Sequence, residues 1–504
     1  MSIKYIEMKI SIKSILPGLV LLLGCSFGCA DLDESPDGLL TPANFYTKNE
    51  DLKAGTVAAY RPFMEFWLNS QGSLPTLAGD DVTGREGGNK EPFRGFDRFV
   101  ASPAYEWLKA FSWDPLFRTV FHTNAVINNY ENVPASEERD QIAAEAFFLR
   151  GWAYFRLART FGDVPLILAD ATGEEPRTPV AEVYDQIFAD LEFAAATLPA
   201  SWPGEPGRVS KWAAKSLLAK AYLTSAGWPL KRTENYAKAA DVAREVLDDN
   251  THALMPEYRE LWNAMNDNNP ESVLAVQACE TCGDWGLSNR MPFSIGPEAE
   301  EGGWDDYYAE IAFFEEFPEG PRKEATFQTE FANGVTWQEA STGHPYYHKT
   351  RGFESAKTNS LNPYVIRYAD AYLLFAEADN KANNGPSTAA FDAVNAIRRR
   401  AAGLDIDAPA PDVDLSDLDA DAFHRAVIAE RGWEFAGEWE RWWDLVRNEM
   451  VAEATSKRRF DDELPLNNSV DVDAEASFQP FYLAPIPQNE LLLRPDWEQN
   501  PCCR

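Results

Sequence analysis

The stretch Gly151-Trp-Ala-Tyr-Phe-Arg-Leu-Ala158 decides the fold class of this chain. It places small alanines beside a tyrosine on the apolar face of a helix, and residues 219–223 and 370–376 repeat this arrangement. Small residues let two helices touch while large aromatic rings fill the space beside them, as in stacked tetratricopeptide-like helix pairs. The spacing of the three copies is irregular, so we expect helix pairs decorated by long insertions.

The helical pattern extends well beyond these three stretches. Ser210 is placed to cap one helix, and Thr178 with Pro179 is placed to open another. The chain is therefore predicted to be mainly α. Apolar periodicity predicts helices at residues 146–161, 179–198, 211–225, 235–247, 365–381, 388–401, 422–435 and 438–446.

Two long segments break the helical pattern. Residues 68–104 and 279–361 are polar, rich in glycine and without periodicity. Irregular stretches of this length are uncommon unless they serve a function. We expect one domain over residues 29–504, with its helical scaffold at 105–260 and 362–450, and we expect the two insertions to carry the ligand-binding surface.

The composition favours binding over catalysis. The 504 residues include 46 Lys+Arg and 80 Asp+Glu, which gives a net charge of −34. A field of that sign repels phosphate backbones, so we expect no nucleic-acid partner. The chain has only 5 His but 16 Trp, 18 Tyr and 30 Phe, a poor supply of metal ligands and a rich supply of stacking surfaces. No cofactor or metal is expected.

The first residues have the character of an export signal. Lysines precede a short apolar run at 15–23, which is too short to cross a bilayer as a helix. The run ends in Leu22-Leu23-Gly24-Cys25, which resembles a bacterial lipobox, and Cys29 is a second candidate for the lipidated cysteine. Lipid chains on that cysteine would hold the protein at a membrane. We therefore expect a lipoprotein signal segment at 1–28, whose end is residue 24 or 28.

Chemical motifs are mostly absent. Cys279 and Cys282 lack a second cysteine pair or a histidine, so we expect a local disulfide or two inert thiols. The densest motif, residues 430–447, spaces Glu434, Glu438 and Arg441 three and four residues apart, as an ion ladder on one helical face. A structural network is favoured there over a catalytic acid. An exported glycoside hydrolase with two carboxylates stays an alternative.

Beyond these patterns, a set of motifs occurs in a familiar order. This order resembles the SusD/RagB family of outer-membrane nutrient-binding lipoproteins across nearly the whole chain. The chain departs from the family at its end, where Cys502-Cys503 stands in place of Gly-Tyr. The motifs lie at residues 29–36, 40–46, 145–166, 183–199, 366–378, 395–401, 430–447 and 485–501.

The resemblance implies a scaffold of four tetratricopeptide-like helix pairs, with loop insertions forming one ligand face. It also implies a lipid-anchored protein on the extracellular face of the outer membrane. Such a protein binds an oligo- or polysaccharide without catalysis and passes it to a SusC-like TonB-dependent transporter. A peptide-binding RagB-type variant and a repeat scaffold that binds only protein remain alternatives. Family alignment favours Cys29 as the lipid anchor, whereas the lipobox favours Cys25.

Candidate ligand contacts follow from loop chemistry, because the family's ligand residues have no sequence signature. Trp285 and Trp304 lie in stretches flanked by Gly and Asp, where an indole ring can stay exposed and stack on a sugar. The competing interpretation is that these tryptophans anchor their own loops. The remaining candidates are Tyr307 and Tyr308 as a substitute pair, with Asp80, Asp81 and Arg85 as hydroxyl-binding groups.

Overall fold

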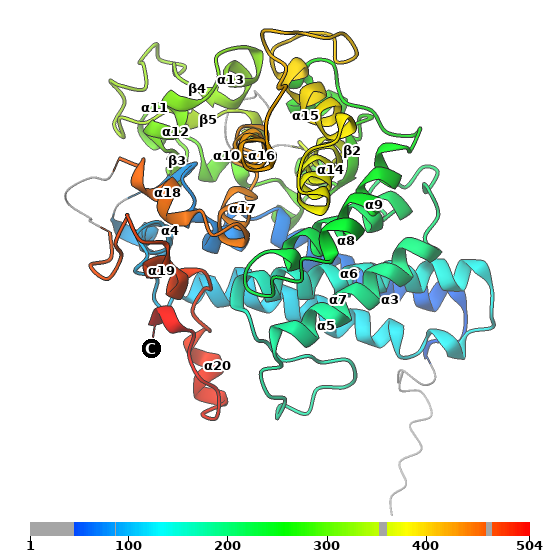
Figure 1. Ribbon diagram of the computed structural model, residues 1–504. Coiled ribbons are helices and arrows are strands. Elements are labelled where there is room, and N and C mark those ends of the chain that lie inside the picture. Colours follow the sequence, from blue (N-terminus) through cyan, green and yellow to red (C-terminus); the bar gives the residue numbers. More distant parts are fainter. Residues whose placement is uncertain (1–44, 86, 352–359, 460–465, 504) are drawn as a thin grey trace, which may run out of the picture. The chain divides into compact units, whose positions relative to one another are not determined.

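A computed structural model of the protein describes residues 45–85, 87–351, 360–459 and 466–503. The signal segment at 1–28, with Cys25 and Cys29, lies outside these residues. The segment and the choice of lipidated cysteine therefore stay predictions. Within the described ranges, helices dominate and strands are short (Figure 1). None of the helices in these ranges has the length and apolar character needed to cross a membrane.

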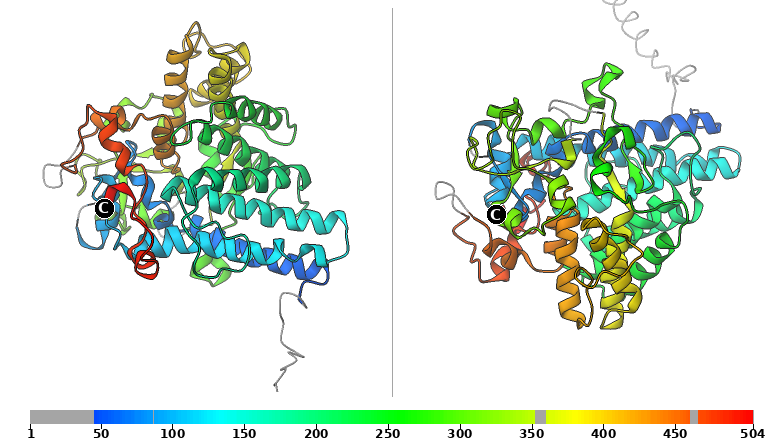
Figure 2. Two further views of the ribbon diagram at one scale, coloured as in Figure 1. Left: turned by 60° about the horizontal axis from the view of Figure 1, so that its bottom comes forward. Right: turned by 90° about the horizontal axis from the view of Figure 1, so that it is seen from above.

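The scaffold is a row of long helices in which each packs against the next. Helix α3 packs on α5, α5 on α6, α6 on α7, α7 on α8, α8 on α9, α9 on α14, and α14 on α15 and α16. Figures 1 and 2 show this row running from blue through green to yellow. The predicted mainly α, tetratricopeptide-like scaffold is confirmed. The helices span α3 Asn49–Trp67, α5 Asp114–Ile127, α6 Glu137–Phe161, α7 Val180–Thr197, α8 Lys211–Ala226, α9 Asn235–Leu247, α14 Tyr368–Asn383, α15 Thr388–Ala401 and α16 Ala420–Glu434.

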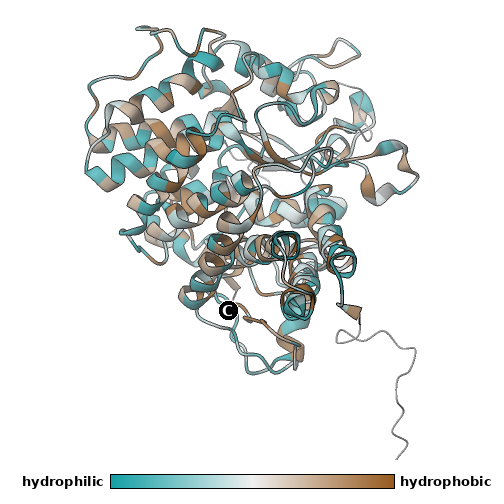
Figure 3. Cartoon of the chain, turned by 90° about the vertical axis from the view of Figure 1, so that its right-hand side faces the viewer, coloured by the Kyte–Doolittle hydropathy of each residue, from teal (hydrophilic) through white to brown (hydrophobic). Residues whose placement is uncertain are grey.

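Small residues set the distance between helices in this row. A Cβ on Gly151 of α6 would lie 3.0 Å from the side chain of Leu191 on α7. Ala153 on α6 and Ala219 on α8, both in the stretches singled out above, have no exposed surface. Hydrophilic and hydrophobic residues are intermixed along the helices (Figure 3), while α6 and α8 are buried over most of their length. The small residues of the sequence pattern thus mark helix contacts.

The start of one predicted helix is shifted by a neighbouring strand. The predicted helix at 365–381 begins later, at Tyr368, because strand β6 (Tyr364–Arg367) pairs with β2 (Ser272–Ala275). Ser210 caps α8 as predicted, accepting a hydrogen bond from the Ala213 N–H.

The prediction that Thr178 caps helix α7 is wrong. Helix α7 begins at Val180, and the Val180 N–H donates to the carboxylate of Asp163 at 2.7 Å. The backbone N–H of Thr178 instead bonds Val164, so a residue from the preceding turn supplies the cap.

Short elements build the remainder of the described chain. Strand β1 (Val82–Gly84) pairs antiparallel with β3 (Tyr307–Ala309), and β4 (Phe327–Gln328) pairs with β5 (Tyr346–Tyr347). The short helices are α4 Glu91–Asp97, α10 Met291–Ser294, α11 Glu298–Glu301, α12 Ile311–Glu316, α13 Pro321–Thr326, α17 Arg441–Arg447, α18 Val451–Ser456, α19 Glu475–Phe478 and α20 Gln488–Leu493.

The residues of the 430–447 motif form ion pairs, but not along one helical face. Helix α16 ends at Glu434, and the backbone then turns through left-handed conformations at Gly437 and Trp439. Glu434, fully buried, accepts hydrogen bonds from arginines on three different segments. The arrangement supports the structural interpretation, because it ties distant segments together inside the core.

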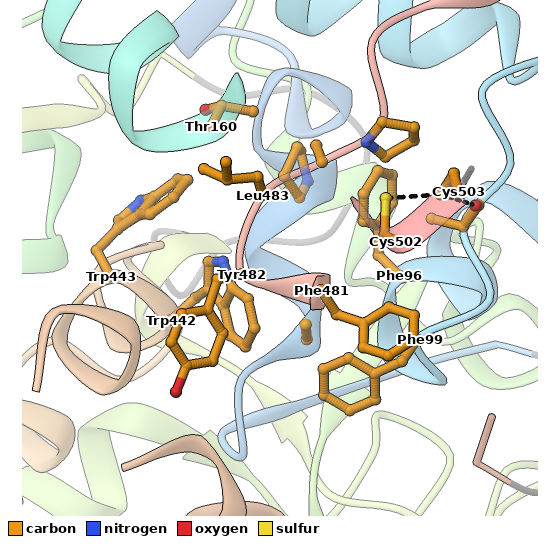
Figure 4. Close-up of a pocket in the computed structure, with 15 residues that line it drawn as sticks. Phe96, Phe99, Thr160, Trp442, Trp443, Phe481, Tyr482, Leu483, Cys502 and Cys503 are labelled. Atoms are coloured by element: carbon orange, nitrogen blue, oxygen red, sulfur yellow. Dashed lines mark hydrogen bonds between the residues drawn. The ribbon is translucent and has the colours of Figure 1, made fainter. Parts of the chain in front are cut away.

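The cysteines occupy two separate places. Cys279 and Cys282 are joined in a disulfide. Cys502 and Cys503 lie in a C-terminal turn that closes over an aromatic pocket, where Cys503 Sγ contacts the Ala101 carbonyl at 3.3 Å (Figure 4). Phe96, Phe99 and Trp442 line that pocket. Cys502 and Cys503, which replace the family's usual Gly-Tyr, therefore pack against this pocket.

Candidate ligand-binding face

The two insertions predicted from the sequence meet in space. In the β1–β3 pair, Val82 lies opposite Ala309 and Gly84 lies opposite Tyr307. Beside this pair, the Arg290 N–H donates to the Leu68 carbonyl at 3.2 Å. Hydrogen bonds therefore join segments more than two hundred residues apart into one surface, which we call the ligand face.

A stacked pair of aromatic rings lies on this face. Trp304 and Phe293 have ring centroids 4.6 Å apart and planes inclined by 24°. Both side chains are half-buried, so each keeps part of its surface in contact with solvent. Lys90 Nζ lies 5.9 Å from the centroid of the Trp304 ring. We call the stacked pair the platform, since a flat, partly exposed aromatic surface can bind the apolar face of a sugar ring.

The loop that carries Trp304 is fixed by its own backbone. The Trp304 N–H donates to the Phe293 carbonyl at 2.8 Å, and the Asp306 N–H donates to the Ser294 carbonyl at 2.7 Å. Gly303 lies so close to Gly296 that a Cβ there would be 2.0 Å from the Gly296 oxygen. The Trp304 position therefore depends on a glycine at 303.

Charged side chains from the first insertion flank the platform. Arg85 pairs with Glu298 and lies 3.4 Å from Asp305, and Lys90 pairs with the buried carboxylate of Asp306. Each cation is thus tied to the loop that holds Trp304. The predicted candidate Arg85 therefore lies at the edge of the platform, where it positions the loop.

A small aromatic pocket adjoins the platform. Helix α10 connects the two features, because Met291 lines the pocket and Phe293 belongs to the platform. The indole N–H groups of Trp67 and Trp262 in this pocket have no hydrogen-bond acceptor among the described residues. The pocket is lined mainly by Trp67, Trp262, Asn289, Met291, Tyr364, Glu438 and Trp439.

The backbone of the pocket wall is strained. Trp439 has a φ of 67°, in the left-handed region that side chains with a Cβ rarely adopt. Its ring contacts Tyr307 with centroids 4.9 Å apart. Strain of this kind costs about 1–3 kcal/mol, so the packing around Trp439 must hold its backbone in place.

The prediction that Tyr307 and Tyr308 contact the ligand is wrong, because both side chains are buried. Tyr307 is 1% exposed and lies between Phe93 and Trp439. Tyr308, on the opposite face of β3, is also buried and packs against His344. Both faces of β3 are covered by other elements, so neither ring can meet a ligand in this conformation.

The prediction that Asp80 and Asp81 bind sugar hydroxyls is also wrong, because both carboxylates are buried. Asp80 is buried and accepts two hydrogen bonds from Arg441, at 2.6 and 2.8 Å. Burial by itself would raise the pKa of Asp80, but Arg441 holds it below its usual value. Asp81 is 3% exposed and accepts a hydrogen bond from the Gly437 N–H. Burial, with the adjacent Asp80 charge, raises the pKa of Asp81 to about 6.

The sequence missed several residues of this face. Phe293 lies in the apolar stretch Met-Pro-Phe-Ser, which looks like part of the core. Lys90 belongs to no motif that would single it out. Trp67 belongs to the end of α3, where an indole is expected in the core. Trp285 begins a helical turn at Trp285–Leu287, and its side chain is outside the described residues, so its role stays a prediction.

Comparisons with known proteins agree with this architecture. A model described as the SusD family matches residues 322–502, and one described as "Starch-binding associating with outer membrane" matches residues 101–223. SusD-like protein P25 of Formosa agariphila is 25% identical, over 96% of this chain and 97% of its own length.

Solved structures share the fold. A SusD homolog of Bacteroides thetaiotaomicron aligns with a TM-score of 0.79 at 23% identity, covering 91% of this chain and 98% of its own. A protein described as a laminarin-binding SusD-like protein aligns with a TM-score of 0.70 at 25% identity, over 90% of this chain and all of its own. The two family models and the curated relative, together with the motifs and the fold, support the SusD/RagB family for this chain.

Proposed function

We propose that this protein binds a carbohydrate on the ligand face and delivers it to a SusC-like TonB-dependent transporter, without catalysis. The observation that carries the proposal is the half-buried Phe293–Trp304 platform, which is built from the second insertion and braced by Arg85 and Lys90 of the first. Indole stacks on the C–H face of a pyranose, and polar groups around it can bind hydroxyls.

The comparisons support the ligand class. The laminarin-binding relative has the same fold over nearly its whole length, and one matching family is described as starch-binding. Delivery to a transporter and anchoring through Cys25 or Cys29 at the extracellular face of the outer membrane follow from the family resemblance and the lipobox. They belong to the same proposal.

Hydrolysis is not favoured by the carboxylates at this face. The adjacent pair Asp80 and Asp81 is buried, and Asp80 is held by Arg441, so this pair cannot reach a glycosidic bond. Asp306 is also buried and paired with Lys90. These acids are part of the buried structure of the face.

Calorimetric titration of the full mature protein with neutral and acidic oligosaccharides, and with peptides, tests the proposal. Trp304→Ala is expected to cost about 1–3 kcal/mol of binding free energy, the scale of an interfacial hot spot. Trp212→Ala, which removes a half-buried indole from the scaffold helix α8, is the matched control and should leave affinity unchanged.

Three results would contradict the proposal. They are binding of peptides alone, appearance of new reducing ends during incubation, or equal affinities of wild type and Trp304→Ala. Transport is tested separately: affinity purification after gentle detergent extraction should bring down a barrel, and repeated recovery of the chain alone would oppose delivery.

A further inference from the structure

Arg290, a cation of the ligand face, has no side-chain hydrogen-bond or ion-pair partner in the part of the chain that the structure describes. Arg290 lies immediately before α10, and its backbone N–H donates to Leu68 O. Its side chain is half-buried and forms no ion pair or hydrogen bond with any residue that the structure describes. The guanidinium Nε is itself buried without an acceptor. An unpaired, partly desolvated charge is costly, so such groups usually have a partner.

The acids nearest Arg290 are already engaged by other arginines. Arg61 binds Glu65 at 2.9 Å and Asp284 at 3.1 Å, and Arg118 binds Glu65 at 2.9 Å. The cluster therefore holds three guanidinium groups and two carboxylates, a local excess of one positive charge. This excess stands out in a chain whose net charge is −34.

The electrostatics of Arg290 agree with an unfilled site. Burial lowers the pKa of the guanidinium, and the charges of Glu65 and Asp284 only partly offset this effect. By contrast, Arg85 on the same face pairs with Glu298 and Asp305. Unlike Arg85, Arg290 thus carries a charge that an added anion could pair with.

We propose that Arg290 binds an anionic substituent of the ligand, so that the carbohydrate is an acidic glycan bearing carboxylate or sulfate groups. The guanidinium fork matches the two oxygens of either group. The Phe293 N–H donates to the Arg290 carbonyl at 3.1 Å, so both residues belong to one turn. A sugar chain on the platform therefore passes close to Arg290. This inference rests on the proposed carbohydrate-binding function.

The test uses the full mature protein and defined probes. The carboxylate arm uses alginate and pectin oligosaccharides, the sulfate arm uses carrageenan and fucoidan oligosaccharides, and the neutral arm uses laminarin and xyloglucan oligosaccharides. We expect an acidic probe from one arm to bind at least about tenfold more tightly than the neutral probes, as a buried charge-assisted pair predicts. That affinity should fall as salt is raised.

Variants assign the effect to Arg290. Arg290→Met should lose the preference for the acidic probe, and Arg290→Lys, which keeps the charge without the fork, should restore part of it. Arg425→Met removes an exposed arginine that pairs with Glu453 on the scaffold, and it should change neither affinity nor preference. Melting temperatures of all variants are measured, so that a loss of folding is separated from a loss of binding.

Each outcome has one meaning. Unchanged preference in a folded Arg290→Met protein, or neutral probes that bind as tightly as acidic ones, overturns the role of Arg290 while leaving carbohydrate binding intact. If no probe of any charge binds and Trp304→Ala has no effect, the proposed function fails, and this inference fails with it.

Discussion

Gly303 contacts Gly296 backbone to backbone, with room for hydrogen alone: a Cβ on Gly303 would lie 2.0 Å from the Gly296 carbonyl oxygen and 2.3 Å from its carbonyl carbon. The next residue, Trp304, carries one ring of the platform. The position of a proposed binding residue is thus set by a neighbour that has no side chain. This relationship leads to the first prediction.

Gly303→Ala should displace the Trp304 loop and weaken carbohydrate binding by about tenfold or more, the scale of losing an anchor residue. Forcing a methyl group into this contact should cost about 1–3 kcal/mol of stability. Titration with the best-binding oligosaccharide measures the first effect, and urea unfolding measures the second.

Gly173→Ala is the control for this substitution. Gly173 has a φ of 79° with no atom near its Cβ position, so alanine there meets backbone strain without a clash. It should destabilise the protein slightly and leave binding intact. Equal affinity of Gly303→Ala and wild type would show that the loop tolerates the methyl group and that the Trp304 position is not fixed by this contact.

A second prediction concerns Glu434 in the core. Its two carboxylate oxygens accept hydrogen bonds from Arg322 at 3.1 Å, Arg367 at 2.9 Å and Arg400 at 2.6 Å. Burial by itself would raise the pKa of Glu434, but these guanidinium groups hold it well below its usual range. Glu434→Gln leaves three buried cations undercompensated, which should cost about 3–5 kcal/mol of unfolding free energy.

The matched control is Glu453→Gln. Glu453 forms an exposed pair with Arg425 at 2.7 Å, and losing such a pair should cost less than about 1 kcal/mol. Chemical unfolding of both variants separates a buried network from a surface pair. A Glu434→Gln protein as stable as the control would mean that the arginines find other acceptors in the core.

The sequence could predict the scaffold because the signal there is local. Ala153 and Ala219 each belong to a short stretch whose apolar residues recur at helical spacing, and each lies at a helix contact with no exposed surface. The two insertions could also be recognised, since their lack of periodicity is visible in the sequence, and their role as the ligand-binding surface stays a proposal. Their pairing through β1 and β3 gives that proposal a structural basis.

Apart from Trp304 and Arg85, the individual side chains of the site could not be predicted, because their surroundings come from distant parts of the chain. Asp80 is neutralised by Arg441, 361 residues away. Tyr307 is enclosed by Phe93 and Trp439, which precede and follow it at long range. No pattern within the Asp-Asp or Tyr-Tyr dipeptides distinguishes a buried side chain from an exposed one.

The last prediction concerns pH and Asp81. Burial, followed by the charge of Asp80, raises the pKa of Asp81 to about 6 in the folded protein, from an ordinary value of 3.8. The folded state therefore keeps a proton that the unfolded chain releases between about pH 4 and 6. The contribution of this group to stability is fully present below pH 4 and is lost as the pH rises through 6. A shift of this size corresponds to roughly 3 kcal/mol.

Asp81→Asn should remove this dependence, since an amide has no proton to lose in this range and its oxygen can still accept the hydrogen bond that Gly437 donates to Asp81. The variant should match wild type in unfolding free energy at pH 4 and exceed it by up to roughly 3 kcal/mol at pH 8. Urea unfolding of both proteins across pH 4–8 gives the difference directly, and other titrating groups cancel in the comparison. If Asp81→Asn is the less stable protein at pH 8, the ionised carboxylate is itself stabilising, through Arg441, and the burial of Asp81 does not raise its pKa.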